Sequence, residues 1–523
     1  MGLPHVQMTA PAPQRGKHVV IVGGGLAGLT VAEALSQRED FRAAGGRITV
    51  LESAGRTGGL IGTIRDGGWL VERSADSFLA ARPEGLDLAN RLGIAGQLIG
   101  VDARVRRALV WREGGPRPAP RGFRLLAPAQ VAPILTTPLL SVRGRLRVVA
   151  ERFIAARRSD GDESLESFAV RRLGREAFER LVQPLAAGIW TADPARLSMA
   201  AACPDFLEME RTSGSLWAGE RARVRAAGVT ASAGARYGQF VTFRDGMETL
   251  PERLTMRLRD RGVALVTTSA QRISRTPDGL WRVHVASDSG QDTIAAHGLV
   301  LTPAAPVIAR MLDSFDPALA GELAAIPSAG SAIVSLGFRR TPEMHPLDAA
   351  GMVVPRAAGK KILAVSFSSS KFPHRAPEGC VLVRVFLGGA LDPETLQLPD
   401  EQLVDIARAD LADMLRMRGA PLLTRIDRWT AAMPQYHVGH VERVDRIDSL
   451  TARHRGLALA GGAYRGVGIP QVIASGVAAA DRITREMQTQ EMQLGGQAMP
   501  AAAQDMREPG QDVQEAGQDA QPG

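Results

Sequence analysis

Cysteine is scarce in this sequence. The 523 residues include two cysteines, Cys203 and Cys380, which lie far apart in the chain. Because no CxxC pair and no combined Cys/His spacing is present, the sequence excludes a disulfide framework and predicts no metal site. His437 and His440 stand in a stretch interrupted by Pro and Gly, so we interpret them as turn histidines rather than metal ligands. This cysteine usage is typical of a reducing, cytoplasmic setting.

Long apolar runs are also missing. Residues 1–16 lack the apolar segment of a signal peptide, and no run reaches the roughly eighteen apolar residues of a membrane-spanning helix. We therefore expect no secretory leader and no transmembrane segment. Aromatic residues make up 4% of the chain, and no nucleic-acid-binding signature is present. Since single strands are bound by aromatic stacking, we expect no nucleic-acid partner.

What the chain has is size and basic charge. With 523 residues, of which 45% are hydrophobic, it can bury more than one core, so two or three domains are expected. The net charge of +8 comes mostly from arginine. Between Arg104 and Arg158, thirteen arginines stand against two glutamates. Such a segment, with short apolar stretches between the arginines, suits the headgroup layer of an anionic membrane. An ordinary Arg-rich domain surface is the equal alternative.

The most informative pattern lies near the N-terminus. The apolar run His18–Val22 predicts a buried parallel strand, and it is followed by Gly23-x-Gly25-x-x-Gly28 where a helix should begin. In such a turn, Gly23 allows the tight bend, Gly25 lets the backbone approach a pyrophosphate, and Gly28 lets the helix lie close to the strand. The helix N-terminus then offers free N–H groups to the phosphates.

A second strand and two glycine-rich loops complete this prediction. Ile48–Glu52 ends in an acid that is placed to bind a ribose 2′-hydroxyl, so we expect a dinucleotide. Arg56, Gly58 and Gly59 follow directly, and the glycines would let the backbone pass close to a bulky cofactor. A strand, loop and helix recur over Gly456–Met487. They form a second anion-binding arrangement, so two halves of one site are expected at opposite ends of the sequence.

Longer stretches resemble a known family, the FAD-dependent, oxygen-using porphyrinogen oxidases of haem synthesis. The similarity extends over nearly all of His18–Met487. Besides the N-terminal glycines, Glu52 and Arg56–Gly59, it rests on four segments: Gln183–Ser198, Phe243–Leu250, Trp429–His440 and Tyr464–Pro470. The N-terminal pieces are shared with amine oxidases and desaturases, whereas the last two segments are much more specific. Glu72–Phe78 departs from the family pattern, so the backbone there is expected to differ at the substrate edge.

The resemblance implies a fold in several pieces, of classes α/β and α+β. A Rossmann-type FAD-binding domain of the amine-oxidase type accompanies a mixed-sheet substrate domain and a helical, membrane-facing insertion. The expected segments are a flexible N-terminus (1–16), FAD-binding parts (17–90, 236–305, 452–487), the helical insertion (91–205), substrate-domain parts (206–235, 306–451) and a disordered tail (488–523).

The same resemblance implies the cofactor and the site. FAD would be bound non-covalently, and catalysis would need no protein nucleophile because the isoalloxazine accepts a hydride. Three two-electron rounds with oxygen would convert a porphyrinogen to a porphyrin and release H2O2. Arg107 is the expected propionate anchor, since its fork binds a carboxylate bidentately. The product would pass to a ferrochelatase. The expected cofactor-binding residues are Gly23, Gly25, Gly28, Glu52, Arg56, Gly58, Gly59, Gly466, Gly468 and Ile469.

The sequence leaves alternatives open for both the substrate and the class of function. Ser368–Gly379 and Met433–His440 look like the bacterial branch that oxidises coproporphyrinogen III, although protoporphyrinogen IX stays open. An amine oxidase of the monoamine type would attach its flavin to a cysteine near the C-terminal loop, and neither cysteine lies there. A carotenoid desaturase would share the N-terminal motifs but lack the sequence motif Tyr464–Pro470. A non-catalytic, FAD-bound membrane adaptor is the third alternative. The location implied is cytoplasmic, with peripheral contact at the inner face of the cell membrane.

Overall fold

A computed structural model describes residues 16–159, 161–226, 240–287 and 290–497. Its centre is a parallel sheet of five strands in the order β12-β2-β1-β16-β22. The core strand β1 is buried on both faces, as its unbroken apolar run predicts. The strand bounds are β1 His18–Val22, β2 Arg47–Glu52, β12 Ala264–Thr267, β16 Gly298–Leu301 and β22 Leu457–Leu459.

Two hydrophobic clusters cover the two faces of this sheet. Val19 and Ile21 of β1 pack with helices, whereas Val20 and Val22 point into a second cluster with a small antiparallel sheet. The first layer consists of α1 Leu26–Ser36, α3 Pro83–Arg91, α12 Thr249–Asp260 and α18 Ile469–Gln497. The second consists of β13 Ala270–Arg275, β14 Trp281–Ser287, β15 Gly290–Ala296, α13 Ala305–Leu312, α14 Pro317–Ala324 and α17 His440–Ala452.

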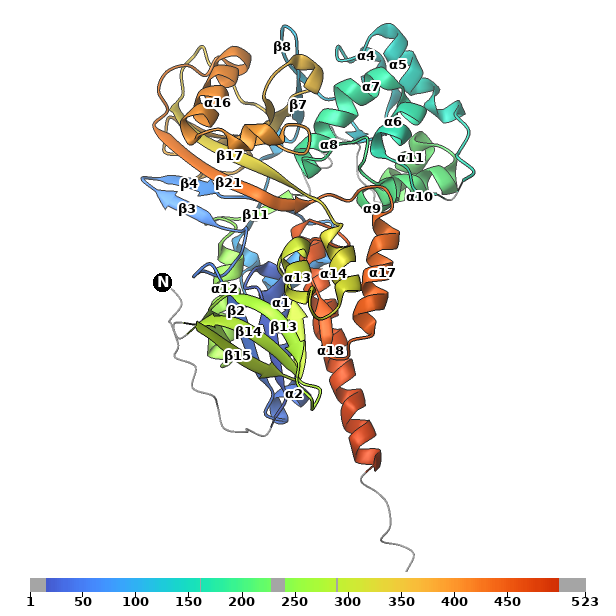
Figure 1. Ribbon diagram of the computed structural model, residues 1–523. Helices are drawn as coiled ribbons and strands as arrows, with labels where there is room; N and C mark the ends of the chain where they lie inside the picture. Colours follow the sequence, from blue (N-terminus) through green and yellow to red (C-terminus); the bar gives the residue numbers. More distant parts are fainter. Residues whose placement is uncertain (1–15, 160, 227–239, 288–289, 498–523) are drawn as a thin grey trace, which may run out of the picture.

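A second, seven-stranded sheet occupies the upper half of the molecule in Figure 1, in the order β21-β17-β20-β19-β18-β7-β8. Helix α16 (Asp400–Leu415) packs on one face, against Val334 and Leu336 of β17. The opposite face meets the β3–β4 hairpin, because a Cβ on Gly337 would press on the ring of Trp69. The strands are β7 Ala108–Arg112, β8 Gly115–Pro118, β17 Ser328–Arg339, β18 Gly351–Val353, β19 Ile362–Ser366, β20 Cys380–Gly388 and β21 Leu423–Pro434.

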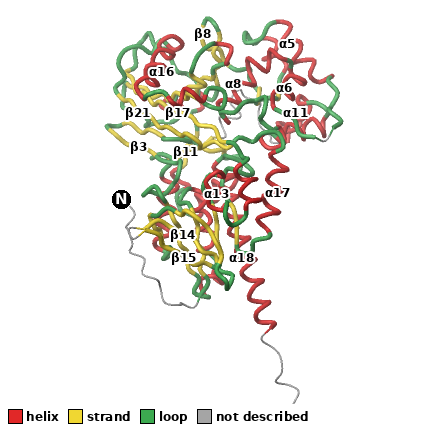
Figure 2. Tube along the Cα trace, in the orientation of Figure 1, coloured by secondary structure: helices red, strands yellow, loops and turns green. Residues whose placement is uncertain are grey.

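Helices beside this sheet form a third part (Figure 2), held by its own apolar cluster. Its centre contains a buried ion pair between Arg172 and Glu151, and Arg172 also bonds Glu210 at 3.2 Å. Its helices are α4 Val131–Thr136, α5 Val142–Val149, α6 Leu165–Leu173, α7 Arg175–Ala177, a π-helical turn Phe178–Val182, α8 Gln183–Trp190, α9 Met199–Ala202, α10 Pro204–Ser213 and α11 Leu216–Ala226.

The remaining helices and strands are short. These are α2 Glu39–Ala43, β3 Thr63–Asp66, β4 Trp69–Glu72, β5 Phe78–Leu79, β6 Leu98–Gly100, β9 Phe123–Arg124, β10 Ala127–Pro128, β11 Phe240–Phe243 and α15 Ser368–Lys371. β11 lies between β5 and β6, so a distant stretch of the chain completes this small sheet.

The structure differs from the expected segments in three places. Strands β7 and β8 fall within residues 91–205, yet they complete the seven-stranded sheet rather than the helical part. Helices α10 and α11 pack in the helical cluster through Phe206 and Trp217, whereas the expected substrate-domain part is 206–235. Helix α18 continues to Gln497, beyond the expected start of the tail at residue 488, and residues 1–15 and 498–523 lie outside the described part. Among the described residues, no helix combines the length and apolar character needed to cross a bilayer.

Candidate functional site

The turn after β1 has the geometry of a phosphate-binding loop. Gly23 has a φ of 101°, and the N-terminus of α1 at Gly25 carries no side-chain cap. A Cβ on Gly28 would lie 1.9 Å from the carbonyl oxygen of Gly23, so only glycine lets the helix approach the strand this closely. The first N–H groups of α1 therefore stay available to a ligand phosphate.

Glu52 ends β2 beside this loop. Its buried carboxylate accepts hydrogen bonds from the backbone N–H of Gly24 at 2.8 Å and of Ala54 at 2.7 Å, one on each oxygen. Because a carboxylate oxygen has two acceptor sites, each oxygen keeps one for a ribose hydroxyl. The residues present thus fit the adenosine end of a dinucleotide.

The loop after β2 touches the loop after β1. The N–H of Gly58 donates to the carbonyl of Gly24 at 2.8 Å, and a Cβ on Gly59 would lie 3.1 Å from the Cα of Gly25. The Arg56 guanidinium donates to the carbonyls of Gly59 at 2.6 Å and Ile61 at 3.0 Å. Arg56 therefore shapes its own loop, and a direct cofactor contact by Arg56 stays a prediction.

The C-terminal loop reaches the same edge of the parallel sheet. Since all five strands are parallel, the turn after β22 lies beside the turns after β1 and β16. Gly466 has a φ of 138°, and helix α18 begins at Ile469. A Cβ on Gly476 would lie 2.9 Å from the carbonyl oxygen of Ala27, which places α18 directly against α1. The two halves of the predicted site are thus brought together.

The predicted substrate anchor lies elsewhere, before β7. The Arg107 guanidinium forms an ion pair with the carboxylate of Asp348, and its Nε donates to the Asp348 carbonyl at 2.9 Å. Both side chains are partly exposed. A substrate carboxylate at Arg107 would compete with Asp348, so this role stays a prediction.

A buried charge cluster lies on the same face of the seven-stranded sheet as Gly337. Asp76 accepts from Lys371 Nζ at 2.8 Å and pairs with Arg384 at 3.4 Å. Burial alone would raise the pKa of Asp76, but Lys371 and Arg384 hold it well below its ordinary value. Sequence reasoning missed this cluster. The available signal was the departure of Glu72–Phe78 from the family pattern.

Glu72 forms a second buried polar contact at this junction. It accepts from Thr63 Oγ1 at 2.7 Å and from the N–H of Met247 at 3.0 Å, while Arg375 lies 4.0 Å away. Burial outweighs these contacts and raises the pKa of Glu72 to about 6. The residue links the β3–β4 hairpin to the turn after β11.

Buried polar atoms without hydrogen-bond partners mark the same region. Among the described residues they include Ser335 Oγ and Asp427 Oδ2. Ser335 lies opposite Arg384 in the sheet register, so the two side chains share one face. Since buried polar groups are normally hydrogen-bonded, these atoms are available to a bound ligand or water.

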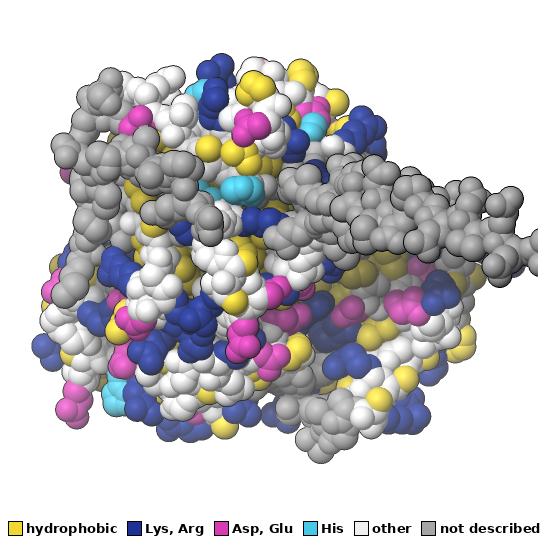
Figure 3. Space-filling model, turned by 90° about the horizontal axis from the view of Figure 1, so that it is seen from below, with side chains coloured by type: hydrophobic (Ala, Val, Ile, Leu, Met, Phe, Trp, Pro, Cys, Tyr) yellow, Lys and Arg dark blue, Asp and Glu magenta, His cyan; other side chains and the backbone are white. Residues whose placement is uncertain are grey.

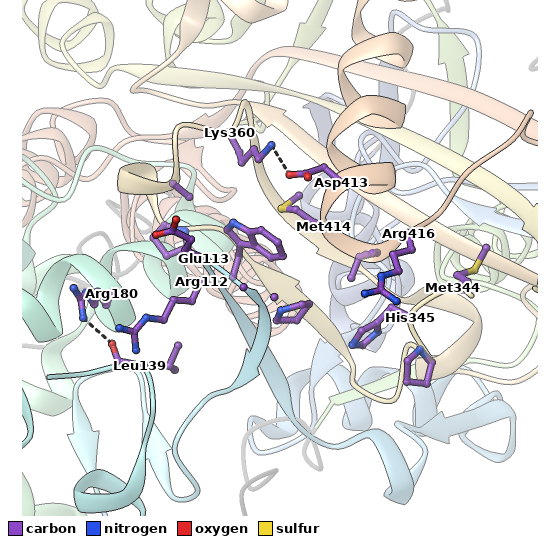
Figure 4. Close-up of a pocket in the computed structure, with 18 of the residues that line it drawn as sticks. Arg112, Glu113, Leu139, Arg180, Met344, His345, Lys360, Asp413, Met414 and Arg416 are labelled. Atoms are coloured by element: carbon purple, nitrogen blue, oxygen red, sulfur yellow. Dashed lines mark hydrogen bonds and ion pairs between the residues drawn. The ribbon is translucent and has the colours of Figure 1, made fainter. Parts of the chain in front are cut away.

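A hollow of about 1090 Å³ lies on the other side of the seven-stranded sheet, at the end of α16 (Figure 4). It contains none of the predicted cofactor residues, and part of its charge is paired internally. Lys360 bonds Asp413 at 2.8 Å, and Arg180 donates to the Leu139 carbonyl at 3.3 Å. We therefore assign the candidate site to the carboxyl edge of the parallel sheet and not to this hollow.

Comparison with known proteins shows similarity to flavin-dependent oxidases along most of the chain. The sequence profile described as "Flavin containing amine oxidoreductase" matches residues 26–484. A "Coproporphyrinogen III oxidase" of Propionibacterium freudenreichii subsp. freudenreichii is 35% identical, over 91% of this chain and 92% of that protein. The protein of the same name from Bacillus subtilis (strain 168) is 31% identical, over 88% and 97%. The crystal structure of a "Putative protoporphyrinogen oxidase" from Exiguobacterium sp. 255-15 has a TM-score of 0.78 at 28% identity, covering 90% of this chain and 99% of that one.

Proposed function

The chain belongs to the family of flavin-containing amine oxidoreductases, and on that premise we propose that it is an oxygen-dependent FAD oxidase of porphyrin synthesis. Its substrates are coproporphyrinogen III and protoporphyrinogen IX, which it converts to the corresponding porphyrins. The observation that carries this proposal is the similarity to coproporphyrinogen III oxidases over about nine tenths of both chains.

The chemistry needs positioning more than reactive side chains. FAD, when bound, supplies the hydride acceptor. A porphyrinogen loses six hydrogens on becoming a porphyrin, so three rounds consume three O2 and release three H2O2. The N–H groups after Gly25 would hold the pyrophosphate, and Glu52 would hold the ribose. The protein holds the macrocycle by its propionates, with Arg107 as the proposed anchor.

Coproporphyrinogen III is the proposed better substrate. It carries four propionates, whereas protoporphyrinogen IX carries two, so it offers more carboxylates to arginine side chains. Two further buried charge contacts would contribute about 3 kcal/mol, on the order of a hundredfold in kcat/KM, while exposed contacts would contribute little. The names of the two sequence relatives support the same preference, whereas the name of the Exiguobacterium structure refers to protoporphyrinogen.

The test is a parallel fluorescence assay of the two reduced porphyrins, corrected for autoxidation. A peroxide assay on the same samples separates an oxidase from a non-catalytic flavin protein. We expect faster formation of coproporphyrin III, with peroxide in a threefold molar excess over porphyrin. A preference for protoporphyrinogen IX would overturn the substrate assignment, and absence of both products would overturn the oxidase.

We also propose peripheral contact of the helical part with an anionic membrane. Lys and Arg side chains are spread over the lower face of the molecule as well (Figure 3), so positive charge alone does not single out the helical part. What supports the contact is apolar exposure, because Val142, Leu146 and Phe153 are 67%, 57% and 76% exposed. Product transfer from this face to a ferrochelatase is part of the same proposal.

A co-sedimentation assay tests this contact. Arg143, Arg152 and Arg158 are exposed, and each would add about 1 kcal/mol near an anionic surface. Their triple replacement by Gln should reduce binding to phosphatidylglycerol vesicles. Arg147 is unsuitable for this purpose, because it donates to the carbonyls of Arg171 and Arg172 at the end of α6. If the native protein ignores anionic and neutral vesicles alike, the surface is an ordinary one.

A further inference from the structure

Tyr436 joins both ends of a short turn in the C-terminal loop. Its buried hydroxyl donates to the carbonyl of Gly462 at 2.5 Å and accepts from the N–H of Gly466 at 2.9 Å. The two glycines enclose Ala463, Tyr464 and Arg465. One phenol therefore fixes the entry and the exit of this turn, three residues before α18 begins at Ile469.

His440 supports the same turn from the next helix. Its ring stacks on Tyr436 with centroids 4.1 Å apart and an interplanar angle of 18°. Its Nε2 lies 2.8 Å from the carbonyl oxygen of Tyr464, and since a carbonyl only accepts, Nε2 carries the proton. Burial lowers the pKa of His440, so the ring stays neutral in this tautomer.

Among the described residues, the other side-chain contacts of this turn are exposed ones. Arg465 pairs with Asp445 at 2.9 Å and with Asp448 at 2.7 Å on α17, and all three side chains are more than half exposed. The hydroxyl of Tyr464 is buried and has no hydrogen-bond partner among the described residues. Gly466 has a left-handed backbone, and glycine again stands at position 468, so neither residue offers a side chain for packing. The contacts from Tyr436 and His440 therefore add buried polar restraints to this turn from outside it.

The helical part in turn holds the segment that contains Tyr436. The N–H of Ser198 donates to the Tyr436 carbonyl at 2.7 Å, and the N–H of Val438 donates to the Arg196 carbonyl at 2.9 Å. Asp162 accepts from Ser198 Oγ at 2.5 Å. A continuous chain of hydrogen bonds thus runs from the helical part through Tyr436 to the glycine turn at the carboxyl edge.

We propose that Tyr436, supported by His440, is a positioning residue that holds the loop Gly462–Ile469 in the conformation that receives the flavin. This inference rests on the proposed placement of FAD at the carboxyl edge. It also gives the helical part a role in the cofactor site, because that part fixes the backbone of Tyr436. Removing the phenolic hydroxyl should loosen the loop while leaving the buried ring in place.

The experiment compares Tyr436→Phe with the native protein after removal of FAD. Titration of the apoprotein with FAD, followed by flavin fluorescence, should give a Kd raised at least tenfold. The visible absorption bands of the bound flavin should shift toward those of free FAD. Thr451→Val is the matched control, because its buried hydroxyl bonds only the Ile447 carbonyl within α17. It should lower thermal stability without changing the FAD Kd or spectrum.

Two variants at His440 provide a conservative rescue. Gln keeps an N–H that can donate toward the Tyr464 carbonyl, whereas Leu does not. We expect His440→Leu to weaken FAD binding and His440→Gln to recover part of it. A native Kd and spectrum in Tyr436→Phe would overturn the proposal, as would an equal loss in Thr451→Val. These readouts need no porphyrinogen, so failure of porphyrinogen oxidation alone would overturn the proposed function and leave this result intact.

Discussion

Replacing Glu52 by Gln tests the cofactor site most directly. The carboxylate accepts one backbone N–H on each oxygen, at 2.8 Å from Gly24 and 2.7 Å from Ala54. Glutamine keeps one acceptor and turns its amide N–H2 toward the other backbone donor, which loses its partner. A lost bond to a charged acceptor costs about 1.5–3 kcal/mol. If this cost falls on the FAD-binding conformation, the FAD Kd should rise on the order of 10- to 100-fold, since 1.4 kcal/mol is tenfold.

The assay is a fluorescence titration of the apoprotein, accompanied by the flavin-to-protein ratio after gel filtration. Glu39→Gln, on an exposed position of α2, makes the same chemical change away from the loop and should keep the native Kd. Glu52→Arg should abolish retention, because it places a cation against two N–H donors. Should Glu52→Gln retain FAD as tightly as Glu39→Gln, the ribose assignment would be wrong even if the loop is correctly placed.

Three further predictions follow from single contacts. Arg107→Ala should raise KM for a porphyrinogen more than it lowers kcat, with a loss of roughly 1.5–3 kcal/mol in substrate binding free energy. Asp348→Asn should lower KM, because it frees the Arg107 guanidinium from its ion pair. An unchanged KM in folded Arg107→Ala would show that the propionate anchor is another residue. Burial raises the pKa of Glu72 from 4.5 to about 6, so between these pH values the native protein binds more protons than the unfolded chain. The free energy of unfolding should therefore fall by about 2 kcal/mol as pH rises from 4.5 to 6. Denaturant unfolding of Glu72→Gln at several pH values should not show this fall. Acid treatment should release intact FAD, because neither cysteine lies in the C-terminal loop where a covalent flavin link would form: Cys203 is buried and Cys380 begins β20. Flavin left in the protein pellet would contradict this.

The parallel sheet could be predicted because its signals are local. Each pattern lies within about twenty residues: an apolar run of five residues, a glycine turn and a following helix. The elements β1, α1 and β2 form as these patterns predict. Strand neighbours in the seven-stranded sheet are different, because β7 pairs with β18 across more than two hundred residues. No periodicity encodes that register.

In the candidate site, too, the local features could be predicted from the sequence and the contacts between distant segments could not. Glycines are visible in a sequence because their conformational role belongs to a single residue, and those in both loops could be named before any contact was known. A side-chain pair exists only where the fold brings two segments together, as with Asp76 and Lys371, or Arg107 and Asp348. Tyr436 combines the two cases. Its segment was visible as a pattern, but the pattern alone could not reveal a hydroxyl that bonds two glycines of a distant loop. A buried tyrosine whose hydroxyl both donates to and accepts from a glycine-rich loop is therefore a feature to seek in structures of this family rather than in their sequences.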